Sequence, residues 1–222
     1  MYDVIKSTMP FLLEGLWITF QLSILTIFCG SLLGAIVGML RTVDSRLINY
    51  PLGMYIHALR GTPFLIHLYF VYFMLPAIGV SWLQFEAYTA AIIALSLYTS
   101  TYVAEIIRGA IEAVPRGQGE AARATGMTAM QSMWYVVLPQ AVKMMIPPMG
   151  GIYVMIIKGT SIVSVIGIAE LVRAGEHASQ RHPKELMVIY GMTALLYFVY
   201  CYPILRLARW AETKYGSVRL PS

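Results

Sequence analysis

Lys158, Thr160 and Ser161 place a charge and two hydroxyls inside an otherwise apolar stretch of the sequence. A charge is expensive inside a membrane, so an ionisable residue in such a stretch is a functional candidate by default. Lys158 can face a transport cavity or pair with a carboxylate, and the hydroxyls can line a polar path. Two alternatives stay open. Lys158 can extend its long side chain to the membrane interface, and the hydroxyls can bond their own helix backbone.

A second polar group lies in the middle of the chain. Glu105 and Arg108 are three residues apart, a spacing that puts both on one helix face, and Tyr102 shares that face one turn earlier. The expected roles are a structural ion pair or the closing of a gate. His67 can bond a carboxylate or change its charge near neutral pH, or it can remain neutral and packed between helices.

The sequence contains none of the common catalytic motifs. It has no G-x-S-x-G with a triad histidine, no H-E-x-x-H, and no G-x-x-x-x-G-K-[ST] loop for a nucleotide. His177 and His182 are five residues apart, so one helix face does not hold both, and we expect no zinc site. We therefore predict that the chain is not an enzyme and holds no metal or cofactor of its own.

The composition explains what surrounds these polar residues. Of the 222 residues, 58% are hydrophobic and 12% are charged, against about 45–50% and about 25% in soluble domains. These proportions exclude a disordered chain, a nucleic-acid binder and a secreted disulfide scaffold, and they predict an integral membrane protein. The net charge of +5 then reflects basic loops on the cytoplasmic side.

Charge-free runs predict the transmembrane helices, since a span needs about 20 apolar residues. The prediction is an all-α membrane protein with a single domain over residues 1–222 and five spans. The expected spans are about residues 13–40, 52–76, 87–111, 140–168 and 186–208. A hydrophilic segment from about 112 to 139 joins the third span to the fourth, and a charged segment over 170–185 precedes the fifth.

The positive-inside rule predicts an outside N-terminus and an inside C-terminus. With this orientation, ten basic residues fall on the inner face and four on the outer face. The inner residues are Arg41, Arg46, Arg108, Arg116, Arg123, Lys143, Arg206, Arg209, Lys214 and Arg219. The outer residues are Lys6, Arg173, Arg181 and Lys184.

The segment 112–139 carries a recognisable motif. Glu120-Ala121-Ala122 is followed by Gly126 and then by Val136-Val137-Leu138-Pro139. This pattern resembles the EAA motif of the permease subunits of ABC importers. We expect one helix to start at Pro115, a turn at Gly126 that lets two helices fold back closely, and a second helix over Met127–Val137 that Pro139 stops.

The resemblance implies a type I ABC importer fold in a bacterial inner membrane. It implies that Glu120, Ala121, Ala122, Gly126, Leu138 and Pro139 form a coupling segment that docks on a cytoplasmic ATPase. The implied partners are a second permease subunit, two ATPase subunits that bind ATP and Mg²⁺, an extracytoplasmic solute-binding protein, an amino-acid substrate and the lipid bilayer, with no nucleic acid. The alternative is an ion-coupled carrier or channel that works without an ATPase.

Two further segments resemble the polar amino-acid branch of this family. One is Arg60-Gly61-Thr62-Pro63, and the other is Lys158-Gly159-Thr160-Ser161. The resemblance places Lys158, Thr160 and Ser161 near the substrate cavity, and we expect Thr62, His67, Tyr102 and Glu105 to belong to the substrate path as well. This chain has Gly159 where the family often has Asp, which counts against a cationic substrate bound through that position.

Overall fold

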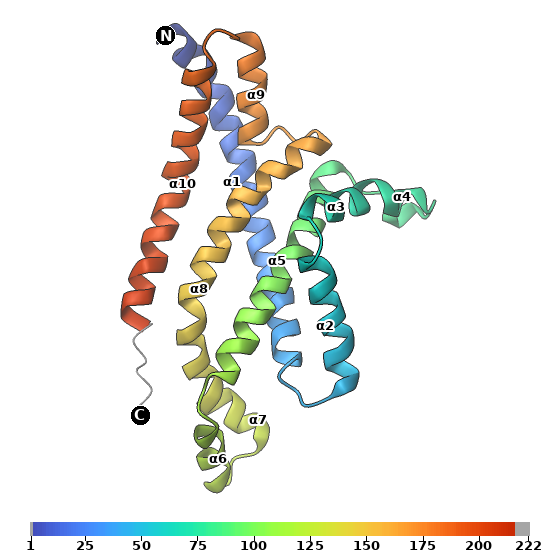
Figure 1. Ribbon diagram of the computed structural model, residues 1–222, viewed down its shortest axis with the longest axis vertical. Coiled ribbons are helices and arrows are strands. Elements are labelled where there is room, and N and C mark those ends of the chain that lie inside the picture. Colours follow the sequence, from blue (N-terminus) through green and yellow to red (C-terminus); the bar gives the residue numbers. More distant parts are fainter. Residues whose placement is uncertain (1, 216–222) are drawn as a thin grey trace.

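The computed structural model describes residues 2–215, and Arg219, one of the basic residues assigned to the inner face, lies outside them. The described part is helical and contains no strand. It forms an elongated bundle in which α1, α5, α8 and α10 run lengthwise (Figure 1). The helices are α1 (Tyr2–Leu40), α2 (Arg46–Arg60), α3 (Phe64–Tyr69), η1 (Phe70–Met74), α4 (Leu75–Ala77), η2 (Ser81–Leu83), α5 (Ala87–Glu112), α6 (Arg116–Ala124), α7 (Ala129–Ser132), η3 (Met133–Val137), α8 (Leu138–Gly159), η4 (Thr160–Ile166), α9 (Leu171–Arg181) and α10 (Leu186–Tyr215).

Glycines bring α1 and α5 together at the centre of the bundle. Gly30, Gly34 and Gly38 recur every fourth residue on one face of α1. A Cβ added at Gly34 would lie 2.6 Å from the Cβ of Val103, and one at Gly30 would lie 2.6 Å from the Cβ of Thr99. Small residues at this spacing let membrane helices pack backbone against backbone. The resulting α1–α5 pair is the frame on which the polar residues of α5 are held.

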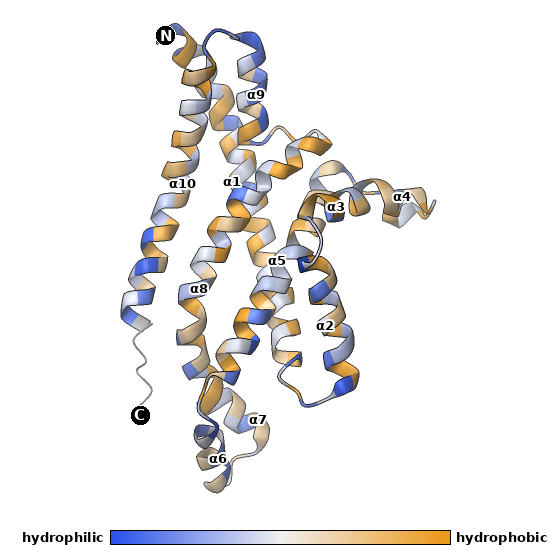
Figure 2. Cartoon of the chain, viewed as in Figure 1, coloured by the Kyte–Doolittle hydropathy of each residue, from blue (hydrophilic) through white to orange (hydrophobic). Residues whose placement is uncertain are grey.

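Four helical segments of the described chain are long and apolar enough to cross a membrane, and a bent pair of helices makes a fifth candidate. Hydrophilic residues gather at α9, around α6 and on the lower part of α10, with apolar residues between them (Figure 2). The hairpin of α6 and α7 lies at one end of the molecule, and α9 and the N-terminal residues lie at the other (Figure 1). The charged segments 112–139 and 170–185 are therefore at opposite ends, as a membrane crossing by α8, which lies between them in the sequence, requires.

The segment expected to form a span over 52–76 is not one straight helix. It consists of α2 and the pair α3–α4, which meet at an angle of 106°. Gly61 ends α2 by donating its N–H to the His57 carbonyl, and Pro63 follows, which disfavours helical backbone at the residue before it. The α3–α4 arm therefore turns away from the bundle (Figure 1), and it carries exposed apolar side chains such as Phe73 and Met74.

Pro139 does not stop the helix before it, contrary to expectation. The helical chain runs from Ala129 through the π-helical turn Met133–Val137 into α8, with Pro139 at the start of α8. Proline removes one i→i−4 hydrogen bond, and a wider π-turn just before it absorbs the misfit without breaking the helix. Pro147 and Pro148 also lie within α8, which is continuous to Gly159. The hydrophilic segment 112–139 is thus continuous with α8 through a helical connection.

Candidate functional site

The turn between α6 and α7 is a C-terminal helix cap built on Gly126. Gly126 has φ of +93° and donates its N–H to the Arg123 carbonyl at 3.0 Å, while Met127 donates to the Ala122 carbonyl at 3.2 Å. These two bonds form a Schellman motif, which needs a left-handed residue at this position. A Cβ at Gly126 would meet nothing within 4 Å. The glycine is therefore required for its backbone conformation and not for the close fold-back that we expected.

Side chains fix the rest of the hairpin. Thr128 caps α7 in a reciprocal capping box with Gln131. Across the hairpin, the Ser132 hydroxyl donates to the Gly119 carbonyl at 3.3 Å. The Gln140 amide donates to the side-chain oxygen of Gln118 at 3.3 Å. These contacts join α6 to both α7 and the first turn of α8.

The motif residues divide between the two faces of α6. Glu120 and Ala121 are exposed at the end of the molecule, whereas Ala122 is 6% exposed and packs inside the hairpin. Both alanines were expected on the docking surface, but only Ala121 is available there. Leu138 is half-buried, Pro139 is exposed, and both lie where the hairpin enters α8. An exposed small residue beside an exposed carboxylate is a surface that fits a groove with basic groups.

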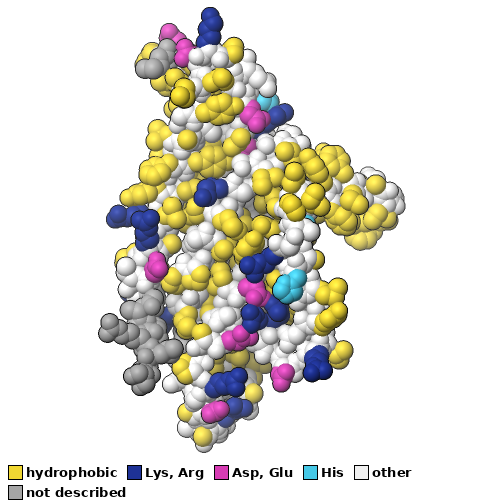
Figure 3. Space-filling view, in the orientation of Figure 1, with side chains coloured by type: hydrophobic (Ala, Val, Ile, Leu, Met, Phe, Trp, Pro, Cys, Tyr) yellow, Lys and Arg dark blue, Asp and Glu magenta, His cyan; other side chains and the backbone are white. Residues whose placement is uncertain are grey.

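A polar stripe runs along α5 toward the hairpin. Its side chains are Tyr98, Tyr102, Glu105, Arg108 and Glu112, spaced three or four residues apart and therefore on one face. The Tyr98 and Tyr102 hydroxyls are 2.9 Å apart. Arg108 bonds Glu105 at 2.9 Å and Glu112 at 2.6 Å. Basic and acidic side chains are visible along this region between α5 and α2 (Figure 3).

Glu105 joins α5 to the end of α1. It pairs with Arg41, which follows α1, as well as with Arg108. The exposed fractions of the Arg41, Glu105 and Arg108 side chains are 16%, 24% and 28%, so the three charges are mostly shielded from solvent. The predicted Glu105–Arg108 pair is present, and Arg41 is a partner that sequence spacing did not indicate.

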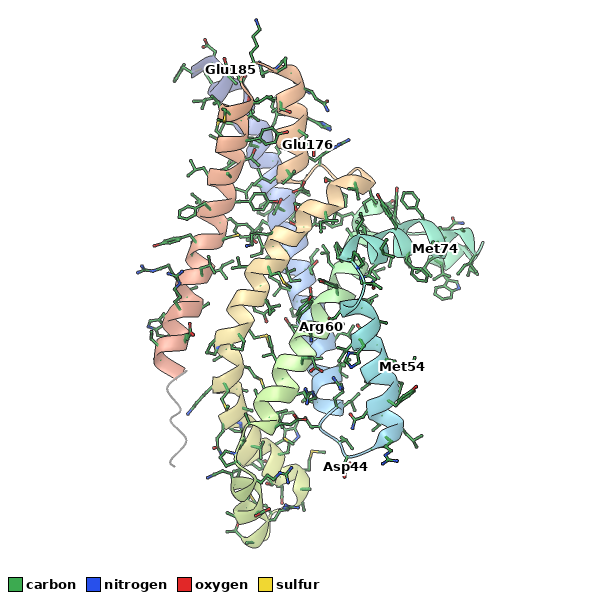
Figure 4. The ribbon with its side chains drawn as sticks, viewed as in Figure 1. Asp44, Met54, Arg60, Met74, Glu176 and Glu185 are labelled. Carbon is green, nitrogen blue, oxygen red and sulfur yellow. The ribbon has the colours of Figure 1, made fainter. Side chains whose placement is uncertain are left out.

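The break between α2 and α3 faces the upper part of this stripe. The Thr62 hydroxyl is 2.6 Å from Nε2 of His67, and the His67 ring centroid is 5.9 Å from that of Tyr98. Arg60 lies at the end of α2 beside α5 (Figure 4), with its guanidinium carbon 4.7 Å from the Tyr102 ring centroid. The structure therefore brings Thr62, His67, Tyr102 and Glu105 into one continuous polar surface.

Lys158, Thr160 and Ser161 form no hydrogen bond with that surface in the described residues 2–215. Thr160 is fully buried and donates to the Ile157 carbonyl at 2.7 Å, and Ser161 donates to the Lys158 carbonyl at 2.8 Å. These are the local backbone bonds that the sequence left open as an alternative. Lys158 is exposed and within electrostatic reach of Cys201 on α10.

Glu170 is a polar residue whose role the sequence did not reveal. It is fully buried and caps α9 by accepting hydrogen bonds from the backbone N–H groups of Val172 and Arg173 at 3.0 and 2.8 Å. The Tyr197 hydroxyl on α10 donates to the same carboxyl at 3.0 Å. Burial raises the pKa of the Glu170 carboxyl, and the three hydrogen bonds oppose that rise. Its position directly before an amphipathic helix was the available signal.

Comparison with known proteins relates this geometry to a transport function. Residues 30–216 match the family described as binding-protein-dependent transport system inner membrane component. The L-cystine transport system permease protein of Bacillus subtilis is 35% identical over 202 residues, which cover 90% of this chain and 85% of that protein. The glutamine transport system permease protein of Escherichia coli is 33% identical over 198 residues, covering 89% and 90%.

Solved structures agree with these sequence relatives. A crystal structure of an amino acid ABC transporter with histidines aligns with a TM-score of 0.85 and 35% identity, over 96% of this chain and 97% of that one. An inward-facing methionine ABC transporter aligns with a TM-score of 0.74 and 21% identity, over 92% and 98%. The second match shows the shared fold only.

Proposed function

The chain belongs to the family of inner membrane components of binding-protein-dependent transport systems, and from that premise we propose how its parts divide the work. It is the transmembrane permease subunit of an amino-acid ABC importer, with the type I importer fold, in a bacterial inner membrane. ATP is hydrolysed by separate subunits. We assign energy coupling to the α6–α7 hairpin and the solute path to the polar surface of α5.

The coupling assignment rests on one observation. Glu120 and Ala121 are exposed at the end of a hairpin whose other face is bonded to the first turn of α8. A partner that pushes on α6 thereby moves the fourth span. We infer that this surface docks on one of two cytoplasmic ATPases, which bind ATP and Mg²⁺. This docking places the hairpin inside the cell and the N-terminus outside.

Cross-linking tests the docking surface. A cysteine at Ala121 is expected to form a cross-link with the ATPase subunit when the two are expressed together, because the side chain at position 121 is exposed. The matched control is a cysteine at Ala122, which is buried one residue away and is expected to give little product. Equal cross-linking at positions 121 and 122 would contradict docking of this surface on the ATPase. The absence of a cross-link at position 121 in a complex that still transports would contradict it as well.

The path assignment follows the continuous polar surface. Thr62, His67, Tyr102 and Glu105 offer hydroxyl, imidazole and carboxylate groups along one side of α5. Arg60 adds a cation over the Tyr102 ring and forms no salt bridge within residues 2–215. We propose Lys158, Thr160 and Ser161 as a second group of path residues, which a partner subunit completes. A second permease subunit, either the same chain or a homologue, closes the path around a two-fold or pseudo-two-fold axis.

The substrate class follows from the relatives and from Gly159. The two relatives are named for L-cystine and glutamine, which are polar amino acids without net charge. Gly159 supplies no carboxylate for a cationic side chain. We therefore propose a polar amino acid of zero net charge, which an extracytoplasmic solute-binding protein delivers to the end of the molecule that carries α9.

A further inference from the structure

A cavity of about 220 Å³ lies between α1 and α9, at the end of the molecule opposite the hairpin. Its α1 wall includes Ser7, Phe11 and Glu14, which share one helix face, and its α9 wall includes His177 and Arg181, one turn apart. The two helices touch at Gly15, where an added Cβ would lie 2.7 Å from the Cβ of Ala174. This close contact fixes the position of α9 relative to α1, and so the distance between the two walls of the cavity.

Opposite charges line this cavity without neutralising each other. Glu14 comes from α1 and Arg181 from α9, and neither makes an ion pair within residues 2–215. The Arg181 guanidinium instead lies 5.0 Å from the Phe11 ring centroid, which holds it over the cavity wall. Histidine, basic and acidic side chains are seen together over α9 (Figure 3). A carboxylate and a guanidinium in one small cavity are complementary to a ligand that carries both an ammonium and an anion.

The size of the cavity limits that ligand. Sites for drug-sized molecules enclose about 300–1,000 Å³, and this cavity is smaller. It suits a molecule of amino-acid size, whose ammonium would meet Glu14 and whose carboxylate would meet Arg181. Phe11 and Ile18 supply apolar surface for the rest of the ligand.

We propose that this cavity is a binding site for a small zwitterion, held between Glu14 and Arg181 at the extracytoplasmic end of the permease. The ligand is a free amino acid, held there before it enters the path, so this reading rests on the proposed function. The same chemistry, an ammonium beside an anion, is present in the headgroup of phosphatidylethanolamine. A free amino acid and this lipid headgroup would both need Glu14 and Arg181 for binding, and the experiment below distinguishes the two ligands.

The test is equilibrium binding of radiolabelled L-glutamine to the complex in nanodiscs of phosphatidylglycerol, whose headgroup carries no ammonium, without nucleotide. The variants Glu14→Gln and Arg181→Gln are expected to weaken binding at one site per chain by about tenfold or more, since each loses a charged contact. The controls are Glu185→Gln and Lys184→Gln. Glu185 lies at the same end of the molecule (Figure 4), and neither residue lines the cavity. A glutamine analogue without the α-amino group is expected to bind the wild type weakly and the Glu14→Gln protein no worse.

A lipid arm separates the two sources. If glutamine does not bind but phosphatidylethanolamine is retained by the wild type and lost from both cavity variants, the zwitterion site stands and its ligand is the lipid. If neither ligand responds to Glu14→Gln or Arg181→Gln, the proposal is overturned. ATP-driven uptake is measured separately, so that absence of uptake counts against the proposed function and unchanged binding counts against the cavity.

Discussion

Replacing Gly126 with proline is expected to abolish ATP-driven uptake while the protein still inserts into the membrane. Proline fixes φ near −65°, whereas Gly126 has φ of +93°. It also removes the N–H that bonds the Arg123 carbonyl, and it disfavours the helical conformation of Thr125 before it. The combined cost is about 3 kcal/mol or more, which is enough to unfold a two-helix hairpin held by a few hydrogen bonds. Uptake and retention of the ATPase during purification are the two measurements.

The matched control is asparagine at the same position. Asparagine tolerates left-handed backbone better than most other residues with a side chain, and a Cβ at position 126 meets nothing within 4 Å. The Gly126→Asn protein is therefore expected to keep most of its uptake. If Gly126→Asn and Gly126→Pro impair uptake equally, then coupling requires position 126 to lack a side chain, and the left-handed backbone is not the reason for the glycine. A Gly126→Pro protein that retains the ATPase and full uptake would show that the coupling assignment is wrong.

Replacing Glu105 with glutamine is expected to destabilise the protein more than the same replacement at Glu112, the other acidic residue of this network. Glu105 is the carboxylate that both Arg41 and Arg108 contact. Arg41 contacts it through Nη1, and the Nε of Arg41 is buried without a hydrogen-bond partner in the described residues 2–215. Removing the charge leaves two shielded guanidinium groups poorly compensated, at a cost of about 1–3 kcal/mol. Thermal unfolding of the purified complex measures the effect, and uptake shows whether the end of α1 must stay attached to α5 during transport.

Glu112→Gln is the control for this network. Glu112 bonds only Arg108, and its side chain is 53% exposed. An exposed pair of this kind contributes about 0.3–0.5 kcal/mol. Equal destabilisation by the two substitutions would mean that burial of the Arg41–Glu105 contact contributes nothing.

The long apolar helices and the hairpin position were predictable because both depend on local patterns. Charge-free runs of span length predicted α1, α5, α8 and α10, and α1 extends beyond the predicted span to Tyr2. The motif spacing located the turn at Gly126. The bend between α2 and α3 was harder to predict because the run 61–85 has no charge, and only Gly61 and Pro63 mark the break.

Contacts between distant segments were not predictable from spacing. Arg41 and Glu105 are 64 residues apart, and Tyr197 and Glu170 are 27 apart. A sequence pattern reports which residues share a helix face, but it does not report which helix that face meets. The repeated glycines at positions 30, 34 and 38 were an available signal for the α1–α5 contact, because glycine at every fourth position marks a helix-packing face. The split of Ala121 and Ala122 between surface and interior also depended on the fold of the hairpin.

Uptake by reconstituted vesicles tests the account most directly. The chain is inserted with its ATPase, a second permease subunit and the solute-binding protein, and radiolabelled L-glutamine and L-cystine are supplied with and without ATP. The account predicts uptake of at least one of these amino acids that requires ATP and the ATPase and that Gly126→Pro abolishes. Uptake driven by an ion gradient in vesicles that contain the permease chain and no ATPase would contradict it.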